Sequence, residues 1–369
     1  MKNKVLFIAS TFSHIRNFHL PYLKAFQDLG WEVHIACGGK AEKLPYVDQF
    51  FELPFEKSIF SPKNFRAASI IRRLVREESY QLLCPHATLA SFFARLAIKA
   101  MPRRPKLLCM SHGYLFDDST NPLKRFIYLC AEKFTVRQTD LLLTMNEYDY
   151  ELARREHLGL RVEFIPGVGV NYEKLDQTVS DNKEDIRKQL GVSPDALVLF
   201  YAAELSGRKS QQTLIHAMTS LPDNVILILA GDGALRDEYV QLAETLGVSN
   251  RVLFPGHISP VGPWYVMSDI VVSSSRSEGL PFNIMEAMHL GKPIVASRVK
   301  GHEDLIQDGV NGLLFPYEDS NACVEQIKKL LNNPVLCHSL GSHAAVDSDQ
   351  YSIENVFPVV WNKYLSVIK

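Results

Sequence analysis

Short apolar runs alternate with amphipathic stretches along the first half of the chain. The apolar runs lie at 5–10, 32–38, 82–86, 106–112, 141–146 and 162–167. Most of them are apolar throughout, which is typical of strands buried on both faces of a parallel sheet. Patterns with helical spacing, such as NFHLPYLKAFQDLG and FRAASIIRRLVREES, separate these runs. The alternation predicts a doubly wound α/β domain.

The same pattern then starts again in the second half. Its apolar runs lie at 197–205, 224–233, 251–256, 269–275, 292–298 and 312–316. Two such sheets without a repeated sequence period predict an α/β protein of two Rossmann-like domains with a cleft between them. We expect an N-terminal domain at 1–165 and a C-terminal domain at 166–350, with the polar stretch 166–195 as the junction. An aromatic helix expected at 351–369 can pack back on the first domain.

Composition supports a folded chain of two domains. The chain has 369 residues, of which 46% are hydrophobic and 22% are charged, so disorder is not expected. Residues 1–165 hold 24 Lys+Arg against 17 Asp+Glu, a balance of +7, and the remainder holds 16 against 24, a balance of −8. Either these are solvated faces, or the first half meets an anionic partner. The pI of about 6.9 and the lack of interleaved basic and aromatic residues argue against nucleic-acid binding.

Cysteines and apolar segments indicate the compartment. The six cysteines form no C-x-x-C pair, so zinc is not expected, and most read as buried free thiols in a reducing environment. The first apolar run is too short for a signal peptide, and no stretch is long enough for a spanning helix. We expect a cytoplasmic protein, with peripheral attachment to the inner face of the cell membrane as an option. The basic stretches 72–76 and 102–106 would favour anionic headgroups, although 72–76 also fits the solvated side of an amphipathic helix.

Two glutamates with seven residues between them frame a predicted strand-to-helix turn. Glu278 follows the run at 269–275, and Glu286 lies one turn inside the next helix. Backbone N–H groups at such a helix start suit phosphate, and a carboxylate there can accept hydrogen bonds from a ribose diol. Arg208 and Lys209, after the run at 197–205, could neutralise a diphosphate. The alternatives are a capped helix with exposed glutamates and a solvated basic turn. A glycine turn at 231–233 could make room for a ligand or be an ordinary loop.

A family resemblance rests on these and further motifs. The segments AELSGRKSQQTLIHA, LAGDGALRDE, VLFPGHI, SEGLPFNIMEAMHLGKPIVAS and GHEDLIQDGVNGLLF occur in the order of the donor domain of the family 4 retaining glycosyltransferases. The segments HLPYLKAFQDLGWEVHIAC, MSHGYLF, TDLLLTMNEYDYELA and FIPGVGVN are similar to the branch that builds bacterial capsular, exopolysaccharide and other cell-surface glycans. The resemblance covers essentially the whole chain and implies the two-domain GT-B fold.

The resemblance also implies roles for individual residues. Glu286 would bind the donor ribose, and Glu278 would contact the donor sugar. Lys209, assisted by Arg208, would hold the diphosphate. The turn that would meet the phosphates comprises Gly279, Leu280, Pro281, Phe282 and Asn283. The backbone that would meet the nucleobase comprises Gly256, His257 and Ile258. His112 would lie beside the transferred sugar, which gives His112, Glu278 and Lys209 as candidate catalytic residues, unless His112 is an ordinary strand-end histidine.

The chain departs from the family in two places. Where much of the family has Gly-Arg-Leu before the diphosphate lysine, this chain has Ala203, Glu204 and Leu205. A glutamate there would repel phosphate, so the phosphate clamp must rest on other groups. The second departure is the polar loop expected after the first strand, which either makes acceptor or domain-closure contacts or caps the helix that follows. Its polar residues are Ser10, Ser13, His14, Arg16, Asn17 and His19.

The expected activity is a retaining transfer of a hexosyl or N-acetylhexosaminyl group from a nucleotide sugar, with UDP as the expected nucleotide. No Asp-x-Asp motif follows a strand, so we expect no metal or other cofactor. A glycan or a polyprenyl-diphosphate-linked sugar in surface polysaccharide assembly is the expected acceptor. Two alternatives remain open: a catalytically weak nucleotide-sugar-binding partner of another transferase, and a GT-B nucleotide-sugar epimerase.

Overall fold

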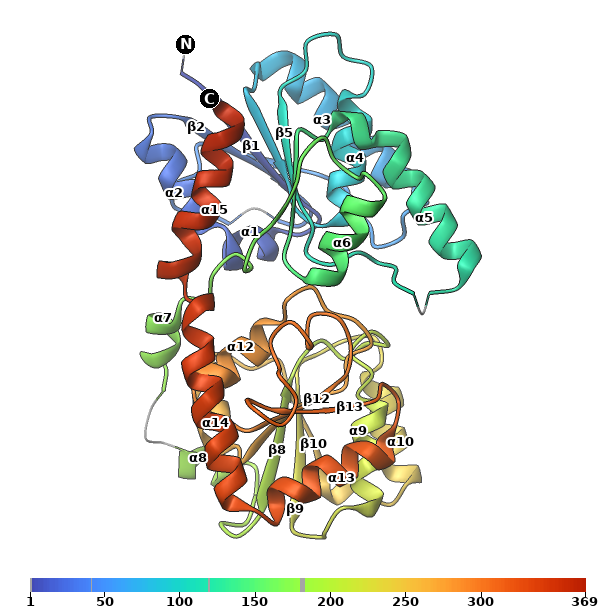
Figure 1. The fold of residues 1–369 in the computed structure, drawn as a ribbon, viewed down its shortest axis with the longest axis vertical. Coiled ribbons are helices and arrows are strands. Elements are labelled where there is room, and N and C mark those ends of the chain that lie inside the picture. Colours follow the sequence, from blue (N-terminus) through green and yellow to red (C-terminus); the bar gives the residue numbers. More distant parts are fainter. Residues whose placement is uncertain (1, 41, 119, 180–182) are drawn as a thin grey trace. The chain divides into compact units, whose positions relative to one another are not determined.

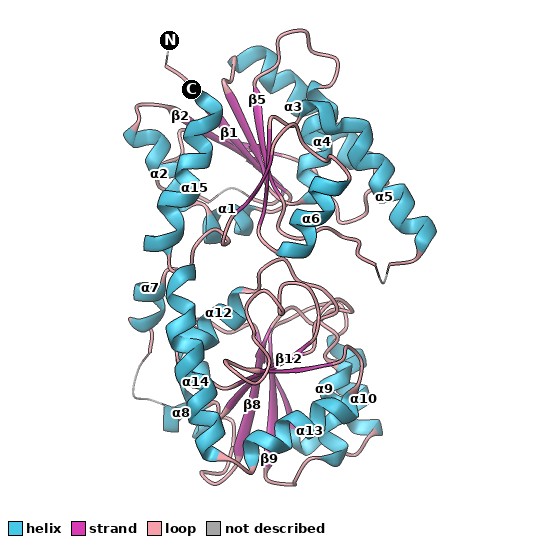
Figure 2. Cartoon of the chain, viewed as in Figure 1, coloured by secondary structure: helices cyan, strands magenta, loops and turns pink. Residues whose placement is uncertain are grey.

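The computed structural model describes residues 2–40, 42–118, 120–179 and 183–369. The chain forms two compact units (Figure 1). Unit 1 comprises Met1–Gly169 together with Glu354–Lys369, and unit 2 comprises Val170–Ile353. Each unit holds one parallel sheet with helices on both faces (Figure 2). The prediction of two Rossmann-like domains is therefore confirmed. Among the described residues, none of the helices combines the length and apolar character needed to cross a bilayer.

The sheet of unit 1 has the order β3-β2-β1-β4-β5-β6-β7. Its strands are β1 (Lys4–Ala9), β2 (Glu32–Cys37), β3 (Gln49–Glu52), β4 (Leu82–Pro85), β5 (Lys106–Met110), β6 (Leu141–Thr144) and β7 (Val162–Phe164). Strand β1 is apolar at nearly every position, because it pairs in parallel with both β2 and β4 and is covered on both faces. The edge strand β3 was not predicted, since its sequence QFFE is short and half exposed.

The helices of unit 1 are α1 (Phe12–Phe18), α2 (Leu20–Asp28), α3 (Pro62–Glu78), α4 (Thr88–Ile98), α5 (Pro122–Thr135), α6 (Glu147–Arg155) and most of α15 (Ile353–Ile368), with a 3-10 turn at Val136–Gln138. The C-terminal helix α15 lies beside α2 (Figure 1), where Trp361 packs edge-on against Phe26 and Phe357 stacks on Tyr22.

The segment expected as a polar loop after β1 is largely helical, so that expectation was wrong. Phe12–Phe18 forms α1, and the chain then bends at His19 into α2. The bend follows from Pro21 in the first turn of α2, because proline lacks the N–H group that a continuous helix would need. The two short helices place several polar side chains at the end of β1.

The sheet of unit 2 has the order β10-β9-β8-β11-β12-β13. Its strands are β8 (Leu197–Ala202), β9 (Val225–Ala230), β10 (Val252–Gly256), β11 (Ile270–Ser273), β12 (Ile294–Ser297) and β13 (Leu313–Phe315). Its helices are α7 (Tyr172–Asp176), α8 (Lys183–Gln189), α9 (Gln212–Ala217), α10 (Arg236–Thr245), α11 (Gly262–Met267), α12 (Phe282–His289), α13 (Ser320–Leu331) and α14 (Pro334–Ser348), with 3-10 turns at Met218–Ser220, Ser249–Arg251 and Asp349–Tyr351. Buried aliphatic residues of β8, β9 and β11 form the centre of its core.

Candidate functional site

The predicted phosphate-binding residues meet where the strand order of unit 2 reverses. Strand β8 leads to β9 on one side, whereas its neighbour on the other side is β11. Loops that leave the carboxyl ends of such a strand pair diverge and leave a crevice, which is the usual ligand site in open α/β sheets. The loop after β8 carries Arg208 and Lys209, and the loop after β11 carries Glu278. The backbone joins the two loops through the N–H of Arg276, which donates to the carbonyl of Arg208 at 2.8 Å.

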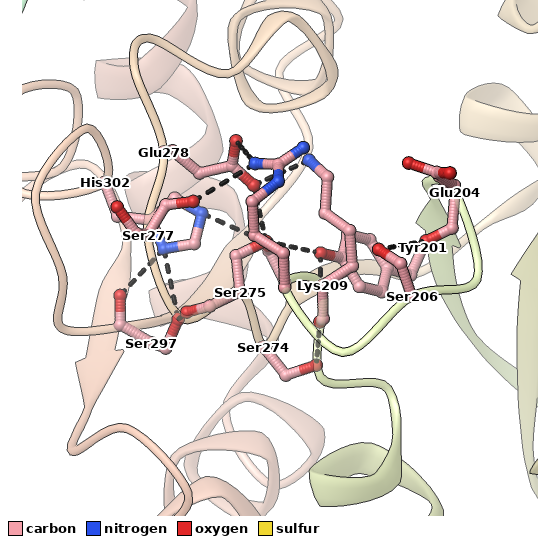
Figure 3. A network of polar contacts seen from close by, with 12 residues as sticks. Tyr201, Glu204, Ser206, Lys209, Ser274, Ser275, Ser277, Glu278, Ser297 and His302 are labelled. Atoms are coloured by element: carbon pink, nitrogen blue, oxygen red, sulfur yellow. Dashed lines mark hydrogen bonds and ion pairs between the residues drawn. The ribbon is translucent and has the colours of Figure 1, made fainter. Parts of the chain in front are cut away.

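A buried carboxylate bonded to two cations forms the centre of this site. Glu278 is 6% exposed, and its Oε1 accepts from Lys209 Nζ at 2.6 Å. Its Oε2 accepts from Arg208 Nη1 at 2.8 Å. The hydroxyl of Ser275 also donates to Oε1. Figure 3 shows Glu278 facing Lys209. The lysine side chain is 12% exposed and the arginine side chain is 50% exposed, so only Arg208 has a large free surface.

The charges explain the protonation state of Glu278. Burial alone would raise the pKa of this carboxyl, but the charges of Lys209 and Arg208 outweigh burial and lower the pKa to about 2. Burial lowers the pKa of Lys209, and the charge of Glu278 opposes that effect. At neutral pH the cluster therefore holds two cations and one carboxylate, a net charge of +1.

A second layer of hydrogen bonds fixes the loop that carries Glu278. The buried His302 contacts the hydroxyl of Ser273 through Nε2 at 3.0 Å. Its Nδ1 contacts the carbonyl of Ser297 at 2.8 Å (Figure 3). Gly301 has φ +82°, and a Cβ there would lie 2.7 Å from the Cβ of Glu278. The glycine is therefore required, because its lack of a side chain lets the loop after β12 pack directly against the Cβ and backbone of Glu278.

Glu286 lies in the first turns of α12, as the spacing predicted. Tyr265 donates its hydroxyl to Glu286 Oε2 at 3.0 Å and to the carbonyl of Asn283 at 3.1 Å. Burial raises the pKa of Glu286 to about 7, against the opposing effect of the Tyr265 bond. The helix begins after Pro281 without a side-chain cap. A helix start carries N–H groups without intrahelical acceptors, so this turn, from Gly279 to Asn283, offers donors for an anion.

The glycines of the 231–233 turn make room for the neighbouring loop of the chain. A Cβ on Gly231 would lie 2.0 Å from the carbonyl of Ala203, and a Cβ on Gly233 would lie 2.2 Å from that of Leu205. Between these two carbonyls, the exposed Glu204 replaces the arginine of the family pattern.

The residues expected to meet a nucleobase follow the edge strand of the same sheet. Gly256 ends β10 with φ +80° and accepts from the N–H of Gly231 at 2.8 Å. His257 is exposed and Ile258 is half-buried.

The candidate residues of unit 1 divide into two groups. Arg16 and Asn17 are exposed on α1, and Arg16 pairs with Glu42 at 3.2 Å. His14 and His112 instead contact each other through their Nε2 atoms at 3.2 Å. His19 is fully buried beside them.

Sequence reasoning missed several residues that support these sites. Ser275 was placed only at the end of a predicted strand, His302 lay inside a quoted motif without a role, and Tyr265 was not considered. The signal for His302 was available, since it lies in the GHEDLI segment that follows a predicted strand. His86, which follows β4, was read only as the end of a strand, although a histidine at a strand end is a candidate ligand-binding residue.

Comparisons with known proteins identify the family. Residues 19–167 match the family described as "Glycosyl transferase 4-like domain", and residues 182–346 match "Glycosyl transferases group 1". EpsD of Bacillus subtilis (strain 168), whose name assigns it provisionally to the glycosyltransferases, is 36% identical over 358 residues, which cover 95% of this chain and 93% of that protein. The chain belongs to the GT-B glycosyltransferases. It is therefore an enzyme that transfers glycosyl groups.

Other proteins are also similar to this glycosyltransferase in sequence or in structure. An Escherichia coli protein named UDP-Gal:alpha-D-GlcNAc-diphosphoundecaprenol alpha-1,3-galactosyltransferase is 22% identical over 338 residues, 88% of this chain and 86% of that protein. The crystal structure of HepE from Anabaena in complex with UDP superposes with a TM-score of 0.76 at 19% identity, covering 99% of this chain and 100% of that one. The same protein was also solved with UDP-glucose, at a TM-score of 0.77, 19% identity, and coverage of 98% of this chain and 99% of that one. These structures share the fold of this glycosyltransferase.

Proposed function

We propose that this glycosyltransferase moves a hexosyl or N-acetylhexosaminyl group from a UDP-sugar, with retention of anomeric configuration, to a glycan or polyprenyl-diphosphate-linked acceptor in cell-surface polysaccharide assembly. UDP and UDP-glucose are named with the HepE structures, and the E. coli relative is named for a UDP-galactose donor and a diphosphoundecaprenol acceptor. These names support the proposed donor and acceptor classes. The preference for a particular sugar depends on a few loop contacts around Glu278.

The observation that carries the proposal is the pair of cations on Glu278 beside the start of α12. A donor diphosphate carries at least two negative charges, and the cluster offers a net charge of +1 together with helix N–H donors. Lys209 is held in place before any ligand binds, because its Nζ is bonded to Glu278 at 2.6 Å. Preorganised charge of this kind stabilises a leaving diphosphate without reorganisation during the reaction.

The remaining proposed contacts to the donor lie at the same edge of the sheet of unit 2. We assign the ribose hydroxyls to Glu286, whose carboxylate is held by Tyr265 at 3.0 Å. The nucleobase is assigned to the backbone at Gly256–Ile258, where the positive φ of Gly256 turns the chain at the end of β10. Glu278 contacts the donor sugar from the phosphate side.

The chemistry requires only charge and positioning from these residues. The bond between C1 of the sugar and the diphosphate oxygen breaks, and a bond from the acceptor oxygen to C1 forms on the same face. The acceptor proton passes to an oxygen of the leaving diphosphate. The cations Lys209 and Arg208 take up the negative charge that develops on that leaving group, so we propose that the step at this site needs no metal. A product of inverted configuration would contradict this route.

We propose that the acceptor side is served by unit 1 at a membrane surface. In the basic stretches noted in the sequence, Arg72 donates to the carbonyl of Ala97 at 2.8 Å and Arg104 pairs with Asp140. Arg73 and Lys106 remain exposed, but these stretches add few exposed apolar side chains to them. Helix α5 offers a better surface. Its exposed apolar side chains are Leu123, Phe126, Ile127 and Phe134. The same helix carries Lys124, Arg125 and Lys133, but Arg125 pairs with Asp118 at 2.9 Å and Lys133 pairs with Glu156 at 2.6 Å. Its apolar side chains would therefore supply most of the contact with an anionic bilayer surface.

The first test measures the apparent unfolding temperature against nucleotides and nucleotide sugars. Ligands that bind only the folded protein raise this temperature. We expect UDP and one or two UDP-sugars to stabilise the wild type, and Glu286→Ala to lose most of that effect. Glu303→Ala is the matched control, because Glu303 is a half-exposed glutamate of unit 2 whose ion pair is with Arg298. If no nucleotide stabilises the wild type, the assigned donor site is wrong.

A second candidate function is suggested by Glu204. An exposed carboxylate in the loop before Lys209 repels an anionic donor, which fits a nucleotide-sugar-binding partner of another transferase. Such a catalytically weak partner would be stabilised by UDP-sugars but would turn them over only slowly. Release of UDP from a UDP-sugar in the presence of lipid-linked acceptors separates the two functions.

A further inference from the structure

Four histidines meet at the carboxyl end of the sheet in unit 1. His14 lies in α1 and His19 at the bend between α1 and α2, whereas His86 and His112 follow β4 and β5. Strands β1, β4 and β5 are neighbours, and β1 is the strand at which the order of this sheet reverses. The cluster therefore lies at the point where open α/β sheets bind ligands, in the unit that does not carry the proposed donor site.

The four imidazole rings lie close together. One ring nitrogen of each histidine lies within 4.8 Å of a nitrogen of every other. The Nε2 atoms of His14 and His112 are 3.2 Å apart, and the ring centroids of His19 and His86 are 3.7 Å apart. The ring of Phe7, on β1, stacks on His86 and gives the cluster an apolar wall.

Two of these histidines are buried without polar partners. His19 and His86 are both 0% exposed. Among the described residues, neither ring nitrogen of either side chain has a hydrogen-bond partner. A buried polar atom without a partner is costly, so two adjacent imidazoles in this state call for a ligand that the protein itself does not supply.

We propose that His14, His19, His86 and His112 form a site for one divalent transition-metal ion of the zinc class. In a tetrahedral site with metal–nitrogen bonds of about 2.0–2.1 Å, ligand nitrogens lie about 3.3 Å apart, which is close to the 3.2 Å between His14 and His112. Rotation of the other rings would close the remaining distances. The proposal departs from the expectation of a chain without metal.

The donor set selects the kind of ion. Four imidazoles and no carboxylate suit zinc, nickel or copper, whereas magnesium and calcium require oxygen ligands. A neutral imidazole presents one lone pair, and the complete burial of His19 and His86 favours the neutral ring over a charged one. Metal-bound histidines usually donate their second N–H to an acceptor, and His19 and His86 have none among the described residues, so we expect micromolar rather than picomolar affinity.

A second cluster in unit 1, made of acidic residues and a histidine, provides a contrast because both ring nitrogens of its histidine have polar partners. His34 contacts Tyr80 and Glu32 through its two ring nitrogens, each at 2.7 Å. Lys4 neutralises that cluster through Glu78 at 2.7 Å and Glu32 at 3.4 Å. That cluster is complete without an ion, whereas the four-histidine cluster is not.

A bound ion would join α1 to the ends of β4 and β5. Coordination of His19 to this ion would fix the bend between α1 and α2, next to the exposed Arg16 and Asn17. It also occupies Nε2 of His112, so His112 would position this surface rather than contact the transferred sugar directly.

The test uses the full chain purified without a polyhistidine tag and stripped with a chelator. We expect one equivalent of Zn²⁺ to bind and to raise the apparent unfolding temperature by about 5 °C at a hundredfold excess over the dissociation constant. One equivalent of Co²⁺ should give the visible absorption of a tetrahedral nitrogen site, and Mg²⁺ should give neither response. Absence of a stoichiometric Co²⁺ spectrum in the wild type overturns the proposal.

Variants locate the site and separate metal binding from folding. The double variant His19→Leu with His86→Phe replaces unpartnered polar rings by apolar groups, so its metal-free stability should equal or exceed that of the wild type while the metal response disappears. His14 is only partly buried, and His14→Gln should weaken zinc binding at least tenfold, even if the double variant does not fold. The exposed His216→Gln in unit 2 is the control and should change nothing. Retention of the full metal response in His14→Gln would refute this site. UDP should still stabilise each variant, which separates this test from that of the donor site.

Discussion

The ion pair between Lys209 and Glu278 predicts a large coupling energy in a double-mutant cycle. The perturbations are Glu278→Gln, Lys209→Met and the two together. Both side chains are largely buried, at 6% and 12% exposure, and their charged atoms are 2.6 Å apart. Removing Glu278 leaves the buried Lys209 without its counter-charge in a desolvated site, whereas removing both leaves only Arg208, whose side chain is 50% exposed and solvated.

The magnitude follows from the titration of Glu278. A fall in pKa from 4.5 to about 2 corresponds to about 3 kcal/mol in favour of the ionised carboxylate. Because the pKa is lowered in the folded protein, this stabilisation is fully present above the unfolded value of 4.5 and is lost as pH falls toward 2. At neutral pH we expect each single substitution to cost about 3 kcal/mol and the double substitution to cost less than their sum by about 2 kcal/mol.

Urea unfolding at pH 7.5 measures the three variants against the wild type. The matched control is Glu303→Gln, which removes a half-exposed carboxylate from its ion pair with Arg298 and should cost less than about 1 kcal/mol. Additive losses in the double variant would refute the reasoning, because they would mean that Lys209 and Glu278 do not depend on each other.

Three shorter predictions concern other parts of the chain. Burial raises the pKa of Glu286 to about 7, so the free energy of unfolding of the wild type should fall as pH rises from about 4.5 to 7. Glu286→Gln should lose this fall, which is on the order of 2 kcal/mol after allowance for partial exposure. The same pH dependence in urea titrations of the variant would contradict this prediction. Gly301→Ala should lower the free energy of unfolding by about 2–3 kcal/mol and weaken UDP-sugar binding, because φ is +82° and the new Cβ would lie 2.7 Å from the Cβ of Glu278. A variant with the melting temperature and donor affinity of the wild type would contradict this prediction. Phe126→Ser should reduce binding to anionic vesicles at low salt about tenfold, whereas the control Val335→Ser, at an even more exposed apolar position of unit 2, should not. Equal vesicle binding by the wild type and both variants would count against α5 as the contact.

Local pattern was sufficient for most of the fold. The runs of β1 and β8 are apolar throughout because both strands are central, so sequence alone identified them. The edge strand β3 was missed because it has only four residues and its two phenylalanines are only half-buried. The division of α1 from α2 could have been anticipated from Pro21, but the residues before it were read as a loop.

The candidate sites were only partly predictable, for a different reason. Glu278 and Lys209 could be placed at strand ends from their spacing, but their bond depends on β8 and β11 being neighbours, which no local pattern states. The same limit hid the histidine cluster. His86 and His112 lie 26 positions apart in the sequence, yet the pairing of β4 with β5 brings their ring centroids to 5.8 Å.

The position of Glu278 between two cations predicts that a substitution there has opposite effects on UDP binding and on sugar transfer. In the free protein its carboxylate neutralises half of the positive charge that the diphosphate would meet at Lys209 and Arg208. Glu278→Gln should therefore bind UDP more tightly, by about tenfold, because both cations lose their internal counter-charge and turn to the ligand. The same variant should transfer sugar more slowly, because its lysine is no longer preorganised. Calorimetry with UDP and a rate measurement with a UDP-sugar separate the two effects, and Lys209→Met should lose both. Weaker UDP binding by Glu278→Gln would mean that the carboxylate holds the nucleotide itself rather than restraining the cations.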